Sequence, residues 1–324
     1  MTANVLHIGT HKTGSSSIQA FLTNNRSALA ARGLDVPVFR GDETSKGHQH
    51  MAAEFRGLSS GPPPEAPART IESLSTRLSP QPAGTNVRLF SAENFYLCRP
   101  PRIELIRDCL GDQTRILCYL REPVSHLRSM WMQHIKRKRL PQSFQDYVES
   151  AQSHFASGMS YYDYDARMYL WRRYFPDVVE AIFEPMENAL FLRKFLDLCG
   201  LGTVDSAGLA IRTPGNVALP DGCSSLLQRL NAMVAAGQLD TATRDFYVGC
   251  VRRNAKHFND LFEPALSMAE YDFSDFMDLF RQHNPRLAPR FESSKTVLTF
   301  AELGGMTDGE ILDIMASEHA KTEA

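Results

Sequence analysis

The chain has 324 residues, 43% of them apolar, and 35 basic against 37 acidic side chains give it a net charge of −2. This length and apolar content suffice for one large α/β domain or two small ones. The near balance of charge excludes a chain-wide positive field that would attract nucleic acid or an anionic membrane, so any basic site must be local.

No targeting or membrane-spanning segment is evident. The chain enters an apolar strand after three residues, without the pattern of a signal peptide, and no apolar run approaches the length of a bilayer span. We therefore expect a cytoplasmic protein. The six cysteines form no Cys-x-x-Cys pair or His/Cys cluster, so we expect reduced, mostly packed thiols and no metal.

The most informative segment is Val5–Leu22, which reads as an apolar strand, a tight turn and an amphipathic helix beginning near Ser15. Backbone N–H groups, the positive end of that helix, the cation of Lys12 and the hydroxyls of Ser15–Ser17 would converge on one small volume. The turn is therefore predicted to hold a phosphate or sulfate group.

This turn differs from the loop that binds ATP in NTP-hydrolysing proteins, which reads Gly, four residues, Gly-Lys-Ser/Thr. Gly9 and Gly14 keep the glycine spacing, but Ser15 stands where the lysine would be and Lys12 lies inside the loop. We predict phosphate binding without NTP hydrolysis.

Two stretches before the next strand are less specific. His48 and His50 are two residues apart, and on an extended segment both imidazoles would point the same way, toward a site or a plain polar face. Residues 57–84 are rich in Pro, Ser and Gly, which indicates a surface excursion around a short helix near 70–78. It would either flank an acceptor cleft or be inert.

Further strands are predicted at Val87–Ser91, Ile116–Leu120 and Val178–Phe183, alternating with helical patterns. Such alternation predicts a mostly parallel sheet with helices on both faces, in which ligands gather at the carboxyl ends of strands. Glu93 lies just beyond one such end and Arg121 beyond another.

Arg121 is followed by Pro123, a residue well placed in a first helical turn, and by Ser129 eight positions after the arginine. A guanidinium suits phosphate because it stays charged and offers forked donors, to which a hydroxyl adds a neutral one. The same helix continues into a basic run over 134–139, which is either a polyanion-binding face or a solvated one.

The chain is more helical after residue 185, with apolar helical spacing over 189–199, 223–234 and 245–262. Thr307 and Glu310 form a plausible helix cap ahead of a polar tail. No linker marks a second domain, so one domain is expected over residues 1–324.

Two of these motifs resemble those of sulfotransferases that use 3′-phosphoadenosine 5′-phosphosulfate. Lys12–Ser17 is similar to their loop for the 5′-phosphosulfate end, typically Pro-Lys-Ser/Ala-Gly-Thr-Thr, with His11 in place of the proline. Arg121 and Ser129 match the arginine and serine that bind the 3′-phosphate. The resemblance covers roughly residues 4–200 in order, and implies a P-loop-NTPase-like α/β fold with a parallel sheet flanked by helices.

The resemblance also implies roles for single residues. Lys12 would be the cation near the transferring group, and Glu93 stands where cytosolic members have a catalytic histidine and other branches a glutamate base. His50 and His48 are competing bases. Phe183 takes the place of a tyrosine near the adenine and would stack on it. The residues implied in nucleotide binding are Lys12, Thr13, Gly14, Ser15, Ser16, Ser17, Arg121, Ser129 and Phe183.

Two further parts of the family pattern are looser. Residues 164–176 are similar to the Tyr, Trp and Phe-Pro helix of glycan sulfotransferases, although the spacing by itself indicates only core packing. The C-terminal Arg-Lys-Gly nucleotide loop has no clear counterpart, with residues 212–216 and 293–295 as weak stand-ins.

The sequence thus predicts a sulfotransferase that moves a sulfuryl group, without a metal, to a hydroxyl of a carbohydrate or small molecule, with no nucleic-acid partner. A P-loop kinase is an alternative, but it would need a Mg²⁺-binding aspartate where Ser91-Ala-Glu93 stands. A non-catalytic nucleotide-binding protein is the other. The acceptor and the oligomeric state are left open.

Overall fold

The computed structural model describes residues 3–39, 47–56, 78–137, 140–157, 160–202, 208–211 and 219–323. The chain forms two compact units, each assembled from separate stretches of sequence. Unit 1 comprises Met1–Glu122, Asp163–Gly215 and Asn284–Arg290. Unit 2 comprises Pro123–Tyr162, Asn216–His283 and Phe291–Ala324. Because the units interleave along the chain, no single linker separates them, and the single domain expected over 1–324 stays a prediction.

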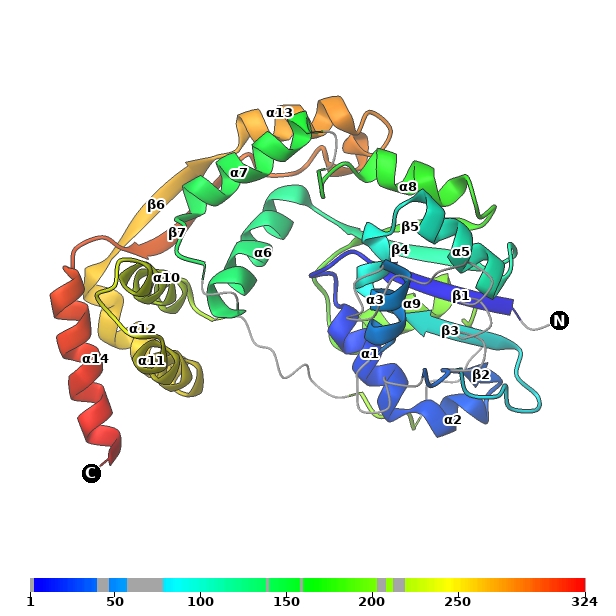
Figure 1. Cartoon of the computed structure of the whole chain (residues 1–324), viewed down its shortest axis with the longest axis horizontal. Helices are drawn as coiled ribbons and strands as arrows, with labels where there is room; N and C mark the ends of the chain where they lie inside the picture. The colour runs from blue at the N-terminus through cyan, green and yellow to red at the C-terminus, as the bar shows by residue number, and fades with distance from the viewer. Residues whose placement is uncertain are drawn as a thin grey trace. The chain divides into compact units, whose positions relative to one another are not determined.

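Unit 1 is an α/β unit built on a five-stranded parallel sheet with the strand order β2-β3-β1-β4-β5 (Figure 1). Its elements in chain order are β1 (Ala3–Gly9), α1 (Ser15–Asn24), α2 (Arg26–Ala30), β2 (Leu34–Asp35), α3 (Gln49–Arg56), β3 (Val87–Ser91), the 3₁₀ turn η1 (Glu93–Leu97), α5 (Pro100–Leu110), β4 (Arg115–Arg121), α8 (Tyr164–Arg172), β5 (Val178–Phe183) and α9 (Asn188–Leu198).

The sheet of unit 1 is covered on both faces because its strand residues alternate in direction. Val5 and Tyr119 lie in an apolar cluster with side chains of α1 and α9, including Phe21 and Phe195. Strand residues of the other parity, such as Leu6, are equally buried but lie outside this cluster. Helices α3, α5 and α8 contact one another in turn, and α8 packs on β5. The core of unit 1 therefore consists of two apolar layers around the sheet.

The strand order fixes where a ligand can bind. The chain runs from the central β1 outward to β2, returns through β3, and crosses to β4 on the other side of β1. In open parallel sheets this reversal leaves a crevice at the carboxyl ends of the strands on either side of the switch. The turn after β1 therefore lies where such sheets bind ligands.

Unit 2 is mainly helical and contains one antiparallel hairpin, β6 with β7. Its elements are α6 (Pro123–Arg137), α7 (Phe144–Ala156), α10 (Asp221–Ala235), α11 (Thr241–Arg253), α12 (Ala255–Phe262), the turn η2 (Glu263–Ala265), β6 (Leu266–Asp272), α13 (Ser274–His283), β7 (Val297–Leu303) and α14 (Asp308–Glu323). The 3₁₀ turn η3 (Ala288–Phe291) contains the point in the sequence where unit 1 gives way to unit 2. The hairpin packs on α10, and Leu303 of β7 lies in the same apolar cluster as side chains of α10, α11, α12 and α14.

The predicted fold class is confirmed, because the four strands expected from the sequence pair side by side in one parallel sheet. The cap at Thr307 is also confirmed, since its backbone N–H donates to the Glu310 carboxylate at 2.7 Å. The helical stretch expected over 245–262 is two helices that meet at Asn254. The short β2 and the hairpin of unit 2 were not predicted. Residues 57–77 of the expected surface excursion lie outside the described residues.

The cysteines are unpaired, and five of the six are buried. Burial raises the pKa of the Cys109 thiol, the least buried of them, to about 11. None of the helices that the structure describes is long and apolar enough to cross a bilayer.

The outer strand β5 carries a buried carboxylate that tests the packing of unit 1. Both oxygens of Glu180 accept from Arg286, at 2.7 and 2.8 Å, and Arg172 donates to Oε1 at 2.7 Å. Burial would raise the pKa of Glu180, but these hydrogen bonds and charges outweigh it and lower the pKa. A lowered pKa means stability that is present above the unfolded-state value and lost as the pH falls through the folded-state value.

We predict that Glu180→Gln lowers the free energy of unfolding at pH 7 by about 2 kcal/mol, because hydrogen bonds between charged groups are lost. The difference should shrink as the pH falls below 4.5, the ordinary glutamate value, because the native carboxylate becomes protonated only below it. Urea unfolding over this pH range measures it. The control is Glu104→Gln, at an exposed pair with Arg107, which should cost less than about 0.5 kcal/mol. Equal losses in the two variants would contradict the prediction.

Candidate functional site

The turn between β1 and α1 has the backbone of an anion-binding loop. Lys12 has a left-handed conformation with φ 61°, and Gly14, at the N-cap of α1, has φ 76°. No side chain caps this helix, and no acidic residue lies in its first turn. The positive end of α1 is thus left for a ligand.

Four successive amides in this turn have no acceptor. The backbone N–H groups of Thr13, Gly14, Ser15 and Ser16 make no hydrogen bond to any residue that the structure describes, whereas the N–H of Ser17 donates to the Gly14 carbonyl at 2.9 Å. Thr13 and Ser15 are buried, so their unpaired amides are costly without a partner. An anion would supply the missing acceptor for several of them at once.

The hydroxyls of the turn divide into two groups. Those of Thr13 and Ser15 donate to the Thr10 carbonyl, at 2.6 and 3.3 Å, and so brace the loop from inside. Those of Ser16 and Ser17 make no hydrogen bond within the described residues, and Ser16 is exposed. Ser15 therefore serves the loop itself, and the expectation that the hydroxyls of Ser16 and Ser17 contact a ligand stays a prediction.

Arg121, the last residue of β4, is tied to this loop. Its Nη1 donates to the Lys12 carbonyl at 2.7 Å, and its own carbonyl accepts from the buried hydroxyl of Tyr164 at 3.0 Å. The guanidinium also lies 5.6 Å from the ring centroid of Phe183. Because a guanidinium has five donors in a planar fork, it can hold the loop and contact a bound anion together.

Phe183 ends β5 beside the same loop. Its ring meets Phe191 edge-on, with centroids 5.6 Å apart. A Cβ on Gly14 would lie 2.6 Å from the ring of Phe191 and 3.4 Å from that of Phe183. Glycine is therefore required at position 14 both by its left-handed φ and by this close approach. That Phe183 stacks on an adenine stays a prediction.

Glu93 lies on the other side of the loop, just past the end of β3 and at the start of η1. A Cβ on Gly9 would lie 2.9 Å from both Cα and Cβ of Glu93, so the backbone of Glu93 sits directly against the start of the loop. Burial would raise the pKa of Glu93, but hydrogen bonds from the Gln19 and Gln49 side chains and the charge of His11 outweigh it and lower the pKa. Glu93 is therefore an ionised carboxylate at neutral pH.

The histidines proposed as competing bases behave differently from the expectation. His48 precedes α3 and is buried: its Nδ1 accepts from the Ser91 backbone N–H at 3.1 Å, and its Nε2 donates to the Pro37 carbonyl at 2.9 Å. It holds β3 in place and has no ring nitrogen left for a substrate. His50 lies on α3 and is exposed. The two imidazoles do not share a face, because the segment enters a helix rather than staying extended.

A further histidine, His7 of β1, is fully buried, and its Nδ1 lies 2.8 Å from the Ser91 hydroxyl. Burial lowers the pKa of His7 to about 4, against the opposing charge of Glu93. His7 is therefore neutral at physiological pH, and it packs against Tyr119 and Phe195.

Four of the predicted site residues lie together within unit 1. Lys12, Arg121, Phe183 and Glu93 all lie at the carboxyl ends of the sheet. Ser129 lies on α6, in unit 2, and its role at a 3′-phosphate stays a prediction.

The remaining candidates lie outside this group. The basic run reaches the end of α6, where Arg137 is exposed, and residues 138–139 lie outside the described part. Residues 212–216 also lie outside it, and residues 293–295 precede β7. Within the described residues, no group of three His, Cys, Asp or Glu side chains could hold a metal.

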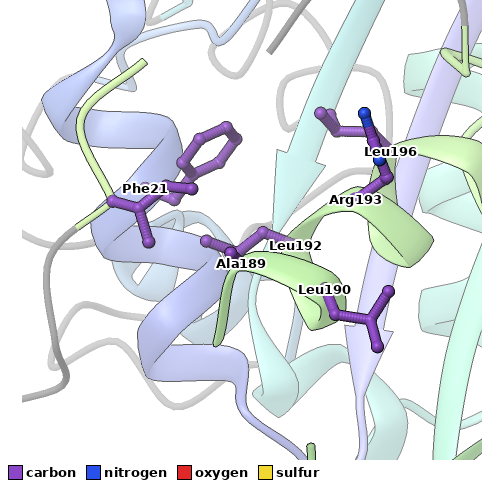
Figure 2. Close-up of a pocket in the computed structure, with 7 residues that line it drawn as sticks. Phe21, Ala189, Leu190, Leu192, Arg193 and Leu196 are labelled. Atoms are coloured by element: carbon purple, nitrogen blue, oxygen red, sulfur yellow. The ribbon is translucent and has the colours of Figure 1, made fainter. Parts of the chain in front are cut away.

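A hollow of about 230 Å³ opens between α1 and α9 of unit 1 (Figure 2). It is lined by Phe21, Ala189, Leu190, Leu192, Arg193, Leu196 and Ile211. None of these is a candidate nucleotide ligand, and the lining is apolar apart from the exposed Arg193. A nucleotide needs several polar partners, so this hollow is not the candidate site.

Sequence reasoning missed the two glutamines that hold Glu93. For Gln19 there was a signal, because it falls on the buried face of α1 with Ile18 and Leu22, where an unpaired amide would be costly. Gln49 gave none, since its place depends on how the chain enters α3. The hydrogen bond from Arg121 to the loop is equally a product of the fold.

Comparison with known proteins gives only a distant likeness to solved structures. No protein-family model matches the chain, and no curated protein sequence is similar to it. Among solved structures the chain is similar to a sulfotransferase from Alicyclobacillus acidocaldarius, with 16% identity and a TM-score of 0.42, covering 75% of this chain and 98% of that one. A likeness this distant carries no functional argument, so the function must be argued from the site.

The close approach of Gly9 to Glu93 leads to a prediction with a matched control. Gly9 and Gly84 both have positive φ, 104° and 77°, but a Cβ on Gly84 would meet nothing within 4 Å. Gly84→Ala should lower the free energy of unfolding by about 1 kcal/mol through backbone strain alone. Gly9→Ala should lose about 2 kcal/mol more through overpacking. Urea denaturation compares them, and equal losses would show that Glu93 does not lie against the loop.

Proposed function

We propose that the chain is a sulfotransferase that moves a sulfuryl group from 3′-phosphoadenosine 5′-phosphosulfate to a hydroxyl of a carbohydrate or small molecule. The observation that supports this most is the run of four amides, Thr13–Ser16, that find no acceptor among the described residues, beside Lys12 and in the same loop region as the ionised Glu93. Amides, a lysine and an arginine suit an anionic donor, and the ionised Glu93 suits an acceptor proton.

Each part of the transfer is assigned to residues of the site. The loop amides and Lys12 would hold the phosphosulfate, and Arg121 would contact the nucleotide's phosphate while fixing the loop. The acceptor oxygen forms a bond to sulfur, and the sulfur–oxygen bond to the 5′-phosphate breaks with its electron pair leaving on the bisphosphate. The proton of the acceptor hydroxyl goes to Glu93. A sulfuryl group carries one negative charge, so fixed donors without a metal can stabilise the transition state.

A P-loop kinase is the first rival, and the site fits it less well. A kinase of this kind holds Mg²⁺ with a hydroxyl after the loop lysine and an aspartate at the end of a second strand. Here the position of that lysine holds Ser15, whose hydroxyl donates to the Thr10 carbonyl. Glu93 is held by two neutral amides. The second rival, a binding protein without turnover, has the same loop and differs only in activity.

Nucleotide binding provides the first test. Arg121→Ala and Lys12→Gly should each weaken binding of adenosine 3′,5′-bisphosphate by roughly 10- to 100-fold, since each removes a charged donor. Glycine tolerates the φ of 61° at position 12, so Lys12→Gly removes the cation without adding strain. Calorimetry measures the affinities. Lys12→Arg and Arg107→Ala, at an exposed pair on α5, are controls that should bind within a few-fold of the native chain. Tighter binding of Mg-ATP than of the bisphosphate would favour the kinase.

Turnover provides the second test. Glu93→Gln should bind the bisphosphate normally and lose sulfuryl transfer by roughly 10²- to 10⁴-fold, the range for removal of a general base. Because the pKa of Glu93 lies below its ordinary value of 4.5, native kcat should fall only as the pH drops below about 4.5. An imidazole base would instead lose activity near pH 6.5. Unchanged turnover in Glu93→Gln would reject Glu93 as the base and direct attention to His50.

A further inference from the structure

Two side chains donate to the carboxylate of Glu93, and both reach the same oxygen. Nε2 of Gln19, from α1, and Nε2 of Gln49, from α3, both donate to Oε2 at 2.8 Å. Among the described residues no side chain donates to Oε1. The two oxygens therefore have different tasks available to them, because one is fixed by two donors and the other carries no side-chain partner.

Both glutamines are fixed in their turn. Oε1 of Gln49 accepts from Nδ2 of Asn94 at 3.0 Å, and Oδ1 of Asn94 accepts from Nη1 of Arg56 at 3.2 Å. This chain of bonds sets which end of the Gln49 amide faces Glu93, so Gln49 can only donate to it. Gln19 is buried, and a Cβ on Gly47 would lie 2.7 Å from its Cγ. Neither amide has room to turn away.

Two donors on a single oxygen favour the ionised carboxylate. A proton on Oε2 would compete with the two N–H donors for that oxygen, so a proton is accommodated on Oε1, where it makes Oε2 a weaker acceptor for both donors. The donors are neutral, so they hold the charge without cancelling it. Cationic partners would hold the carboxylate in a salt bridge and compete with the nucleotide for the same counter-charges.

We propose that Gln19 and Gln49 are positioning residues for sulfuryl transfer: they fix Glu93 through Oε2 and leave Oε1 to take the proton of the acceptor hydroxyl. This inference rests on the proposed function. In the transfer the O–H bond of the acceptor breaks, its oxygen bonds to sulfur, and its proton is left on Oε1. A base with a fixed rotamer pays no ordering cost at that moment.

The other charged groups around Glu93 bear on the test. His11 lies in the loop and lowers the pKa of Glu93. His7, on β1, feels the charge of Glu93 and has a pKa of about 4. Arg56 acts through Asn94. Because His7 also titrates at acidic pH, the carboxyl carbon of Glu93 has to be followed directly rather than through activity alone.

The experiment follows the ¹³C carboxyl resonance of Glu93 against pH in the free protein, with the signal assigned by its loss in Glu93→Gln. Gln19→Leu and Gln49→Leu should each raise the midpoint by about one pH unit, since each removes a hydrogen bond to a charged group. The acid limb of kcat should move by the same amount, and kcat at pH 7 should fall roughly tenfold with KM for the donor little changed.

Further variants keep the test decisive. Gln49→Glu has the same size and places a second carboxylate beside the first, so it should raise the midpoint further. Gln19→Asn and Gln49→Asn keep an amide, but one that is too short to reach Glu93. If the leucine variants fold poorly, the asparagine variants should show the same shift of the midpoint in their place. The control is Gln145→Leu, since Gln145 donates to Glu149 at 2.9 Å on an exposed face of α7, and it should change neither midpoint nor kcat.

The outcomes separate this inference from the proposed function. An unmoved Glu93 midpoint in the glutamine variants would overturn the positioning role, even if the chain transfers sulfuryl groups. A fall in kcat without a shift of the acid limb would also overturn it, because a merely structural defect would produce that result. A shifted midpoint in a chain that does not bind the bisphosphate would reject the proposed function, while it would support that Gln19 and Gln49 fix Glu93.

Discussion

The amides of Thr13–Ser16, which find no acceptor among the described residues, are the constraint on which the rest of unit 1 depends. Buried N–H groups are almost always paired, so a run of unpaired ones requires a structure that keeps them available to a ligand. The left-handed φ of Lys12, the uncapped start of α1 and the bond from Arg121 to the loop all maintain it. The parallel sheet supplies the rigid edge from which this loop projects.

Charge is divided across that edge in a way that suits transfer between two partners. The cations Lys12 and Arg121 lie with the loop, whereas the carboxylate of Glu93 is held by neutral amides on the other side of Gly9. An anionic donor is therefore attracted to one side and the acceptor's proton to the other. A salt bridge between Glu93 and one of the cations would neutralise both charges, whereas neutral donors leave the carboxylate and the cations charged.

The fold was predictable from the sequence where the pattern was local. Apolar strands followed by turns gave the parallel sheet, and strand ends gave the positions of the loop, Glu93 and Arg121. Tertiary contacts were not readable in this way. Gln19 and Gln49 come from helices 30 positions apart and meet only because α1 and α3 converge on Glu93.

Other misses have similar causes. The spacing of His48 and His50 was read for an extended segment, but the chain enters α3 there, and burial gives one histidine a structural task. The two-residue β2 is too short to show a pattern, and the hairpin of unit 2 is half-exposed and weakly apolar.

The central claim is that the loop amides bind the donor anion. The most direct measurement is a titration of ¹⁵N-labelled protein with adenosine 3′,5′-bisphosphate. The account predicts large, saturable shifts of the Thr13–Ser16 amides at one common affinity, and binding that leaves these four resonances unmoved would contradict it.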